Sequence, residues 1–276
     1  SWNTDFTFSF YRDKWKERDE SWSPNPYDMY NAPLRGYYMY LSDGLIQPGE
    51  EVSWMPGALP GQVKLKDIDG YAYNADGTYK TDKHGIPLRT GKPDGKIDYA
   101  DAVFKGCSDP GYLLGLNNTF RYKNFDLNAF FVYAGGNKLR NSVVSMSDQI
   151  GSQTLKGISN RWSADEPDAQ VRMYHDMPSQ VKTYAGIFED WWKYGDINVK
   201  NAGYVKLRSL SLGYNLPLTI CQHLRLNSLK VKVQVNNLFT WCKAGSDIDP
   251  ESYNMNGGTR GMASPKTYSI GLSTSF

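Results

Sequence analysis

The sequence predicts an all-β protein, a transmembrane antiparallel β-barrel to which this chain contributes about six strands. Six segments alternate large apolar and small polar residues with a period of two, and each is about as long as a tilted strand that crosses a bilayer. Their polar sides carry mostly Ser, Thr, Asn and Gly, which is typical of a hydrated pore. The connections between them alternate in length, as they do in outer-membrane barrels.

The first three strands are expected near residues 2–12, 111–122 and 125–136. In the first strand, Trp2, Phe6 and Phe10 alternate with the polar residues Asn3 and Asp5. In the two others, leucines and aromatics on one side alternate with Gly, Asn, Thr, Asp and Arg on the other. One side of each strand is therefore expected to face lipid and the other to face water.

The last three strands are expected near residues 204–216, 228–241 and 267–276. Leu210 and Leu212 follow one phase, whereas Val205 and Leu207 follow the other, so we predict a β-bulge near Arg208. The last strand runs to Phe276, and a closing barrel strand that ends on an aromatic residue is expected at the membrane interface. Six strands are too few to close a barrel, so we expect the last part of a longer chain.

The connections predict the orientation. Strands two and three are joined by a tight turn around Lys123–Asn124, and strands four and five by residues 217–228. The other three connections are long, near residues 13–110, 138–203 and 242–266. Because outer-membrane barrels have short periplasmic turns and long outer loops, we expect these three to be extracellular.

Composition excludes several other classes of protein. Lys plus Arg number 31 and Asp plus Glu 29, so the balance gives no reason to expect a nucleic-acid partner. No apolar run is long enough for a transmembrane helix. The three cysteines and three histidines are scattered, and no nucleophile or acid–base pair shows a recognisable catalytic spacing, so an enzyme is not expected.

Several motifs carry a family resemblance. AGYVKLRSLSLGYNLP (Ala202–Pro217) and LKVKVQVNNLFTW (Leu229–Trp241), followed by Asp249-Pro250-Glu251 and a PKTYSIGLSTSF terminus, resemble the final strands of SusC/RagA-type TonB-dependent outer-membrane transporters. Upstream, NRWSADEPDA (Asn160–Ala169), FRYKNFDLNAFFVYAGGNKLRN and YYMYLSDGLIQPGEE are similar to further segments of that family.

The resemblance implies a 22-stranded barrel with an internal plug, located in the outer membrane of a Gram-negative bacterium. It implies active import of an oligosaccharide or a peptide, driven through TonB, with a SusD-like surface lipoprotein as a lid. Pairs of transporter–lid units and contact with outer-membrane lipid are also implied. The six strands would then be the last six of the barrel.

A split acidic motif predicts a calcium site in the first long loop. KDIDG and PDGKIDYAD become one D-x-D-x-D-G loop if the residues between Gly70 and Asp94 are looped out. The ligands would be the side chains or carbonyls of Asp67, Asp69, Asp94, Lys96, Asp98 and Asp101. The alternative is a set of aspartates that hydrogen-bond turns.

Aromatic residues in the second long loop predict a substrate contact. The stretch FEDWWKYGD places Trp191, Trp192 and Tyr194 beside acidic residues, and sugars or peptides are often held by such aromatic groups together with polar ones. The alternative is that these aromatics pack the loops together or contact the lid.

Two other functions stay open from the sequence. A structural or adhesive outer-membrane barrel would share the same strand pattern without import. A soluble β-sandwich binding module would place the apolar faces in a closed core and would dissolve without detergent.

Overall fold

A computed structural model describes all residues except 20–31, 141–161, 169–194, 246–248, 255–258 and 261–262. The chain forms two compact units. The first contains Ser1–Arg12, Asp109–Leu139 and Asn201–Phe276, and the second contains Asp13–Ser108 and Arg140–Lys200. Among the described residues, no helix has the length and apolar character needed to cross a membrane.

The first unit is built on one antiparallel sheet of six long strands, in the order β1-β6-β7-β10-β11-β14. Each of these six strands pairs with the long strand that follows it in the sequence, so the sheet is a simple meander. The six segments predicted from the sequence overlap these strands. Their bounds are β1 Trp2–Phe10, β6 Tyr112–Tyr122, β7 Phe125–Gly135, β10 Tyr204–Asn215, β11 Ser228–Cys242 and β14 Thr267–Ser275.

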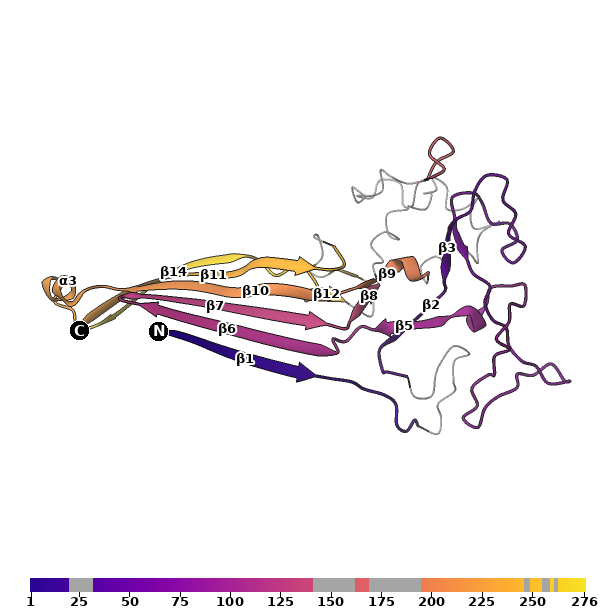
Figure 1. Cartoon of the computed structure of the whole chain (residues 1–276), viewed down its shortest axis with the longest axis horizontal. Helices are drawn as coiled ribbons and strands as arrows, with labels where there is room; N and C mark the ends of the chain where they lie inside the picture. Colours follow the sequence, from indigo (N-terminus) through magenta and orange to yellow (C-terminus); the bar gives the residue numbers. More distant parts are fainter. Residues whose placement is uncertain (20–31, 141–161, 169–194, 246–248, 255–258, 261–262) are drawn as a thin grey trace. The chain divides into compact units, whose positions relative to one another are not determined.

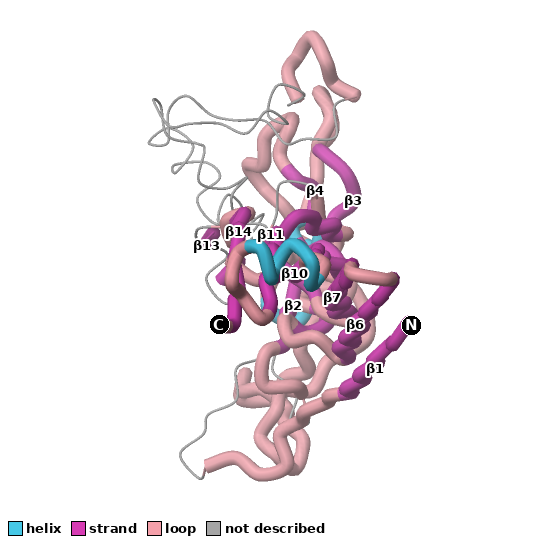
Figure 2. Tube along the Cα trace, turned by 90° about the vertical axis from the view of Figure 1, so that its left-hand side faces the viewer, coloured by secondary structure: helices cyan, strands magenta, loops and turns pink. Residues whose placement is uncertain are grey.

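The short connections and both termini lie at one end of this sheet (Figure 1). The turn after β6 holds Lys123 at a φ of 52°, which lets β7 start two residues later. The connection between β10 and β11 contains a short helix, α3 (Leu218–His223), which was not predicted from the sequence. Figure 2 shows the six strands one after another in the order of their pairing.

The predicted bulge near Arg208 is confirmed. The register of β10 against both neighbours shifts between Leu207 and Ser209. On the β11 side, Asn237 sits at a φ of 53°, a conformation that Asn tolerates better than most residues. The extra residue bends the strand and changes which side chains share a face.

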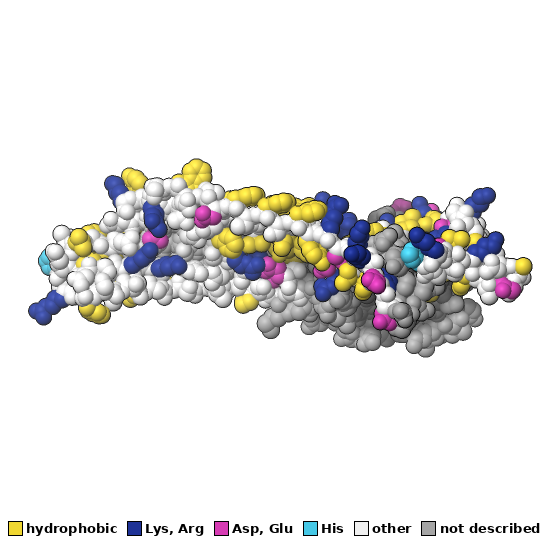
Figure 3. Space-filling view, turned by 90° about the horizontal axis from the view of Figure 1, so that it is seen from below, with side chains coloured by type: hydrophobic (Ala, Val, Ile, Leu, Met, Phe, Trp, Pro, Cys, Tyr) yellow, Lys and Arg dark blue, Asp and Glu magenta, His cyan; other side chains and the backbone are white. Residues whose placement is uncertain are grey.

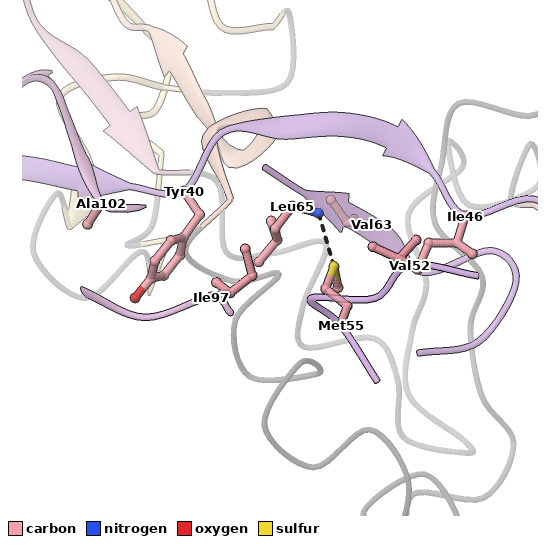
Figure 4. Packing of buried hydrophobic residues seen from close by; sticks show 8 residues of the cluster. All are labelled: Tyr40, Ile46, Val52, Met55, Val63, Leu65, Ile97 and Ala102. Atoms are coloured by element: carbon pink, nitrogen blue, oxygen red, sulfur yellow. Dashed lines mark hydrogen bonds between the residues drawn. The ribbon is translucent and has the colours of Figure 1, made fainter. Parts of the chain in front are cut away.

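The second unit has its own small hydrophobic core. Strand β2 (Gly36–Met39) pairs with β5 (Val103–Cys107), and β3 (Ser42–Leu45) pairs with β4 (Val63–Leu65). The packed residues are shown in Figure 4, where the Leu65 N–H donates to the Met55 sulfur at 3.3 Å. They are Tyr40, Ile46, Val52, Met55, Val63, Leu65, Ile97 and Ala102. The predicted loop 13–110 therefore contains a folded element.

The residues looped out of the acidic motif form a closed ladder of three short segments. The N–H of Ala72 donates to Leu88 O, that of Lys80 to Ala72 O and that of Leu88 to Lys80 O, at 2.9, 2.8 and 2.7 Å. Each segment therefore pairs with the other two, so the insertion is held together by its own backbone hydrogen bonds. The remaining short elements are the 3₁₀ helices η1 (Tyr99–Asp101) and η5 (Asp196–Asn198), and strands β8 (Lys138–Arg140), β9 (Val199–Asn201), β12 (Tyr253–Asn254) and β13 (Thr259–Arg260).

Candidate membrane and pore surfaces and the acidic loop

One side of the six-stranded sheet, here named the apolar face, has no charged residue. Its members follow from the register, because directly paired residues share a face. Figure 3 shows apolar side chains gathered along part of the protein surface. The apolar face consists of Trp2, Thr4, Phe6, Phe8 and Phe10; Tyr112, Leu114, Leu116, Asn118, Phe120 and Tyr122; Phe125, Leu127, Ala129, Phe131 and Tyr133; Val205, Leu207, Leu210, Leu212 and Tyr214; Leu229, Val231, Val233, Val235, Phe239 and Trp241; and Tyr268, Ile270, Leu272 and Thr274.

The apolar face is exposed and not packed into a core. Ile270 is 77% exposed, Phe6 63% and Leu212 48%. Exposed apolar patches of such extent on a sheet mark an interaction with another apolar phase or surface.

Several polar groups on the apolar face have hydrogen-bond partners in the sheet. The side-chain oxygen of Asn118, Oδ1, accepts a hydrogen bond from the Thr4 hydroxyl at 2.8 Å and one from the Trp2 indole N–H at 3.2 Å. The Thr274 hydroxyl donates to Ser228 O at 3.0 Å. Because unsatisfied polar groups are costly in hydrocarbon, this arrangement suits a lipid environment.

Aromatic pairs stand near both ends of the apolar face. The ring centroids of Phe125 and Tyr214 lie 4.6 Å apart at one end, and those of Tyr112 and Tyr133 lie 5.8 Å apart at the other. Strand β6 has 11 residues, so it is about 36 Å long and, tilted by about 45°, spans about 25 Å. That height matches the apolar band of outer-membrane barrels, and the two aromatic rows match its girdles.

The opposite side, here named the polar face, carries a hydrogen-bonded ladder across β1, β6 and β7. The Asn128 amide donates to Asn117 Oδ1 at 2.8 Å and to Thr119 Oγ1 at 3.0 Å. The Asn117 amide in turn reaches Asp5 at 3.4 Å. Amides and hydroxyls bonded in this way are compatible with water on this side of the sheet.

An ion pair crosses the polar face over a glycine. Lys230 Nζ of β11 lies 2.6 Å from Asp126 Oδ1 of β7, although β10 lies between these two strands. A Cβ at Gly213 of β10 would lie 2.6 Å from an Asp126 carboxylate oxygen and 2.6 Å from Lys230 Cε. A side chain at Gly213 would therefore require the ends of these two flexible side chains to shift.

A second charged group lies on the polar face at the other end of β10, and sequence reasoning missed it. Lys206 is buried and its ammonium contacts the carboxylates of Glu251 and Asp249. The signal available in the sequence was Lys206 and Arg208 beside the predicted bulge, followed by the Asp-Pro-Glu motif. Which partner each charge takes depended on where the chain places Asp249 and Glu251.

The structure brings the two halves of the acidic motif together. The carboxylate of Asp67 accepts the backbone N–H groups of Asp94 at 3.2 Å and Gly95 at 2.7 Å. Gly70 and Asp94 are in contact, since a Cβ on Gly70 would lie 2.7 Å from the Asp94 Cβ. Gly95 has a φ of 87°, as the sharp turn of such a loop requires. The insertion therefore leaves the loop continuous in space.

The side chains of this loop are committed to other partners. Asp69 accepts the Gly91 N–H at 2.7 Å, and the ammonium of Lys96 lies 3.1 Å from Asp98 and 3.5 Å from Asp94. The hydrogen bond to Asp98 and the nearby charge of Asp94 raise the pKa of Lys96 above its ordinary value. Within the described part of the chain, no group of three or more His, Cys, Asp or Glu residues is arranged to hold a metal ion.

Asp98 and Asp101 form a capping box around η1. Asp98 accepts the Ala100 N–H at 2.8 Å, and Asp101 accepts the Asp98 N–H at 2.9 Å. Asp101 is fully buried and also accepts the Ile68 N–H at 2.8 Å. These carboxylates therefore organise the backbone, and calcium binding by the loop stays a prediction.

The predicted substrate aromatics Trp191, Trp192 and Tyr194 lie outside the described residues. The segment directly after them is anchored. Asp196 accepts the Ser42 hydroxyl at 2.6 Å and forms an ion pair with Lys105 at 3.0 Å. Burial alone would raise the pKa of Asp196, but the bonds from Ser42 and Lys105 outweigh it, so the pKa lies below its usual value.

Comparison with known proteins gives relatives of one kind. The chain is 24% identical over 256 residues to TonB-dependent receptor P3 of Formosa agariphila, covering 91% of this chain and 23% of that protein. It is 25% identical over 203 residues to TonB-dependent receptor P26 of the same organism, covering 66% of this chain and 19% of that protein. No family model matches the chain. The chain thus spans about a quarter or less of these relatives.

Solved structures show the same fold. A structure of the RagAB peptide transporter matches the whole chain with a TM-score of 0.62 at 19% identity, covering 27% of that chain. The RagAB peptide importer in its closed-closed state matches with a TM-score of 0.64 at 18% identity, again covering 27% of that chain. Sequence and fold together confirm the resemblance of this chain to a part of SusC/RagA-type TonB-dependent outer-membrane transporters.

Proposed function

We propose that this chain forms part of the barrel wall of a TonB-dependent transporter that imports an oligosaccharide or a peptide across the outer membrane. The observation that carries the proposal is the two-sided sheet, with an exposed apolar face free of charges and a hydrogen-bonded polar face. An apolar face in lipid and a polar face in water together make a pore wall. The TonB-dependent relatives support the energy source.

Neighbouring residues of β14 allow a direct test of the membrane assignment. Ile270 belongs to the apolar face and Ser269 to the polar face, at the same depth in the sheet. We expect Ile270→Arg to destabilise the folded full-length protein in lipid bilayers by about 2–4 kcal/mol if it lies near the midplane. Ser269→Arg is the matched control and should change stability little. Equal effects of both substitutions in a folding titration would argue against lipid on the apolar face.

The substrate and the partner follow from the same proposal. The matched structures are of the RagAB peptide transporter and peptide importer, and this match supports a SusD-like surface lipoprotein as partner here. A second transporter–lid pair, a plug domain and TonB complete the proposed machine. Cells that carry the full-length protein should take up labelled oligosaccharides or labelled peptides only when TonB is present. Uptake that continues without TonB would contradict active import.

Two alternatives differ in what they predict. A structural or adhesive outer-membrane barrel would pass the Ile270 test and show no TonB-dependent uptake. A soluble β-sandwich module would need a second sheet over the apolar face, and it would remain in solution without detergent. The exposure of Ile270 and Phe6 speaks against the sandwich.

A further inference from the structure

Two cationic side chains lie against rings of the apolar face, which itself carries no charged residue. The guanidinium carbon of Arg12 lies 5.1 Å from the centroid of the Phe10 ring, and Lys123 Nζ lies 5.4 Å from the centroid of the Tyr122 ring. Both rings are exposed, Phe10 by 60% and Tyr122 by 71%. Each cation is therefore placed on the side of the sheet that is assigned to lipid.

These two cations lie at opposite ends of the apolar face. Phe10 pairs with Tyr112, the first residue of β6, whereas Tyr122 is the last residue of that strand. The ten residues between these two levels rise about 34 Å along the strand, or about 24 Å across a membrane at a tilt of about 45°. Arg12 and Lys123 follow the ends of β1 and β6 within two residues. Their charges thus lie just outside a band as high as the apolar band of outer-membrane barrels.

The chemistry of both side chains suits an anionic partner at the rim of a bilayer. Arg and Lys lay their aliphatic stems along apolar surface and keep the charged group at its edge. The aromatic ring beside each charge attracts it and so favours this position. Guanidinium and ammonium groups are both phosphate-binding groups, and cations at a membrane surface attract anionic lipids.

We propose that Arg12 and Lys123 are contact sites for the phosphate-bearing head groups of anionic lipids, one at each rim of the apolar face. The inference rests on the proposed function, because it requires lipid on the apolar face. It adds the charge of the head group that this surface prefers and the two side chains that make the preference.

Folding titrations of the full-length protein in two kinds of vesicle measure this preference. One kind contains phosphatidylcholine alone, and the other contains phosphatidylcholine mixed with anionic phosphatidylglycerol. We expect Arg12→Gln and Lys123→Gln each to lower the folding equilibrium constant about fivefold more in the anionic vesicles than in the neutral ones. Any effect of the substitution on the β1 end or on the β6–β7 turn is present in both vesicles and cancels in this comparison.

Three controls separate the position of the charge from its mere presence. Lys123→Arg keeps the charge and should retain the stability gained in anionic vesicles. Lys232→Gln removes a charge from the polar face of β11, where Lys232 lies between Gly213 and Gly271, and should behave alike in both vesicles. At about 1 M salt, where the screening length is about 3 Å, the extra loss in anionic vesicles should disappear.

Ile270→Arg in the same vesicles separates this inference from the proposed function. If Ile270→Arg destabilises the protein as expected but Arg12→Gln and Lys123→Gln cost the same in both vesicles, the head-group contacts are overturned and the membrane assignment stands. If Ile270→Arg has no effect, the membrane assignment itself fails, and the head-group contacts fail with it. A lipid-dependent loss in only one of the two variants, or an equal one in Lys232→Gln, also overturns the paired contacts.

Discussion

Single residues decide how charges are arranged on the polar face of this sheet. Gly213 gives Asp126 and Lys230 room to meet above it, each within 2.6 Å of where a Cβ would stand. In the middle of a strand, glycine normally lowers stability, so its presence marks a close approach of other groups.

Replacing Gly213 by alanine should therefore lower stability. We expect a loss of up to about 1 kcal/mol, because the partly exposed ion pair must shift or break to admit a methyl group. Gly271→Ala is the control, since a Cβ there meets nothing within 4 Å. Both variants are compared by thermal unfolding of the full-length protein, and equal melting temperatures would contradict the role given to Gly213.

Glu251 should make the attachment of its loop depend on pH. Burial alone would raise the pKa of Glu251, but the hydrogen bond and charge of Lys206, with Arg208, bring it below its ordinary value of 4.5. Since the folded pKa is the lower one, the stabilisation is complete above 4.5 and is lost as the pH falls through the folded pKa. Asp249 is shifted in the same direction, as bonds from Ser264 and Glu251 outweigh its burial.

Hydrogen exchange of residues 249–254 measures this dependence, after correction for the intrinsic effect of pH. Protection should be full at pH 6 and lower at pH 3. In Glu251→Gln it should be low at both values, because the amide cannot ionise. Protection that is the same at pH 3 and pH 6 in the unsubstituted protein would show that Glu251 does not hold the loop.

At the scale of local elements, the two halves of the acidic motif stay together despite the insertion between Gly70 and Asp94. The residues between Gly70 and Asp94 pair among themselves, so the two ends of the insertion return to the same place and Asp67 can bond Asp94 and Gly95. The capping box of Asp98 and Asp101 then closes the loop on its other side.

Calcium binding by this loop is testable on the same elements. If calcium binds, Asp94 and Asp98 must exchange Lys96 for the ion, and calcium should raise the melting temperature of the full-length protein relative to a chelator. Asp67→Asn should abolish that shift. Glu50→Gln is a suitable control, because Glu50 pairs with Lys64, which lies outside the acidic motif. No shift with calcium in the millimolar range would leave the aspartates as turn formers only.

The predicted role of the loop aromatics in substrate binding can be tested on the full-length protein. The predicted aromatics Trp191 and Trp192 precede the anchored Asp196 by only a few residues. Replacing both by alanine should weaken substrate binding about tenfold to a hundredfold if they stack on the substrate, since aromatic contacts often dominate recognition. Affinity is measured on the full-length protein by calorimetry, with Trp54→Ala as a control for a tryptophan that bonds within the second unit. Unchanged affinity would remove the pair from the substrate site.

The sequence alone was sufficient for the strands and their two faces. Period-two alternation is a local property, because adjacent residues of any strand point to opposite sides, so the apolar and polar faces and the bulge at Arg208 were readable without a structure. The acidic motif was also readable, since its spacing survives on either side of the insertion.

Tertiary structure decided which charges meet. Lys206 with Glu251 and Asp126 with Lys230 across Gly213 join residues that are 45 and 104 positions apart. Such pairs depend on strand register and on how the loops return, and neither is visible in the local pattern of the chain. The small core of the second unit, with Ile46 and Leu65, was hidden for the same reason, because its short strands are held by distant contacts and not by a repeating sequence.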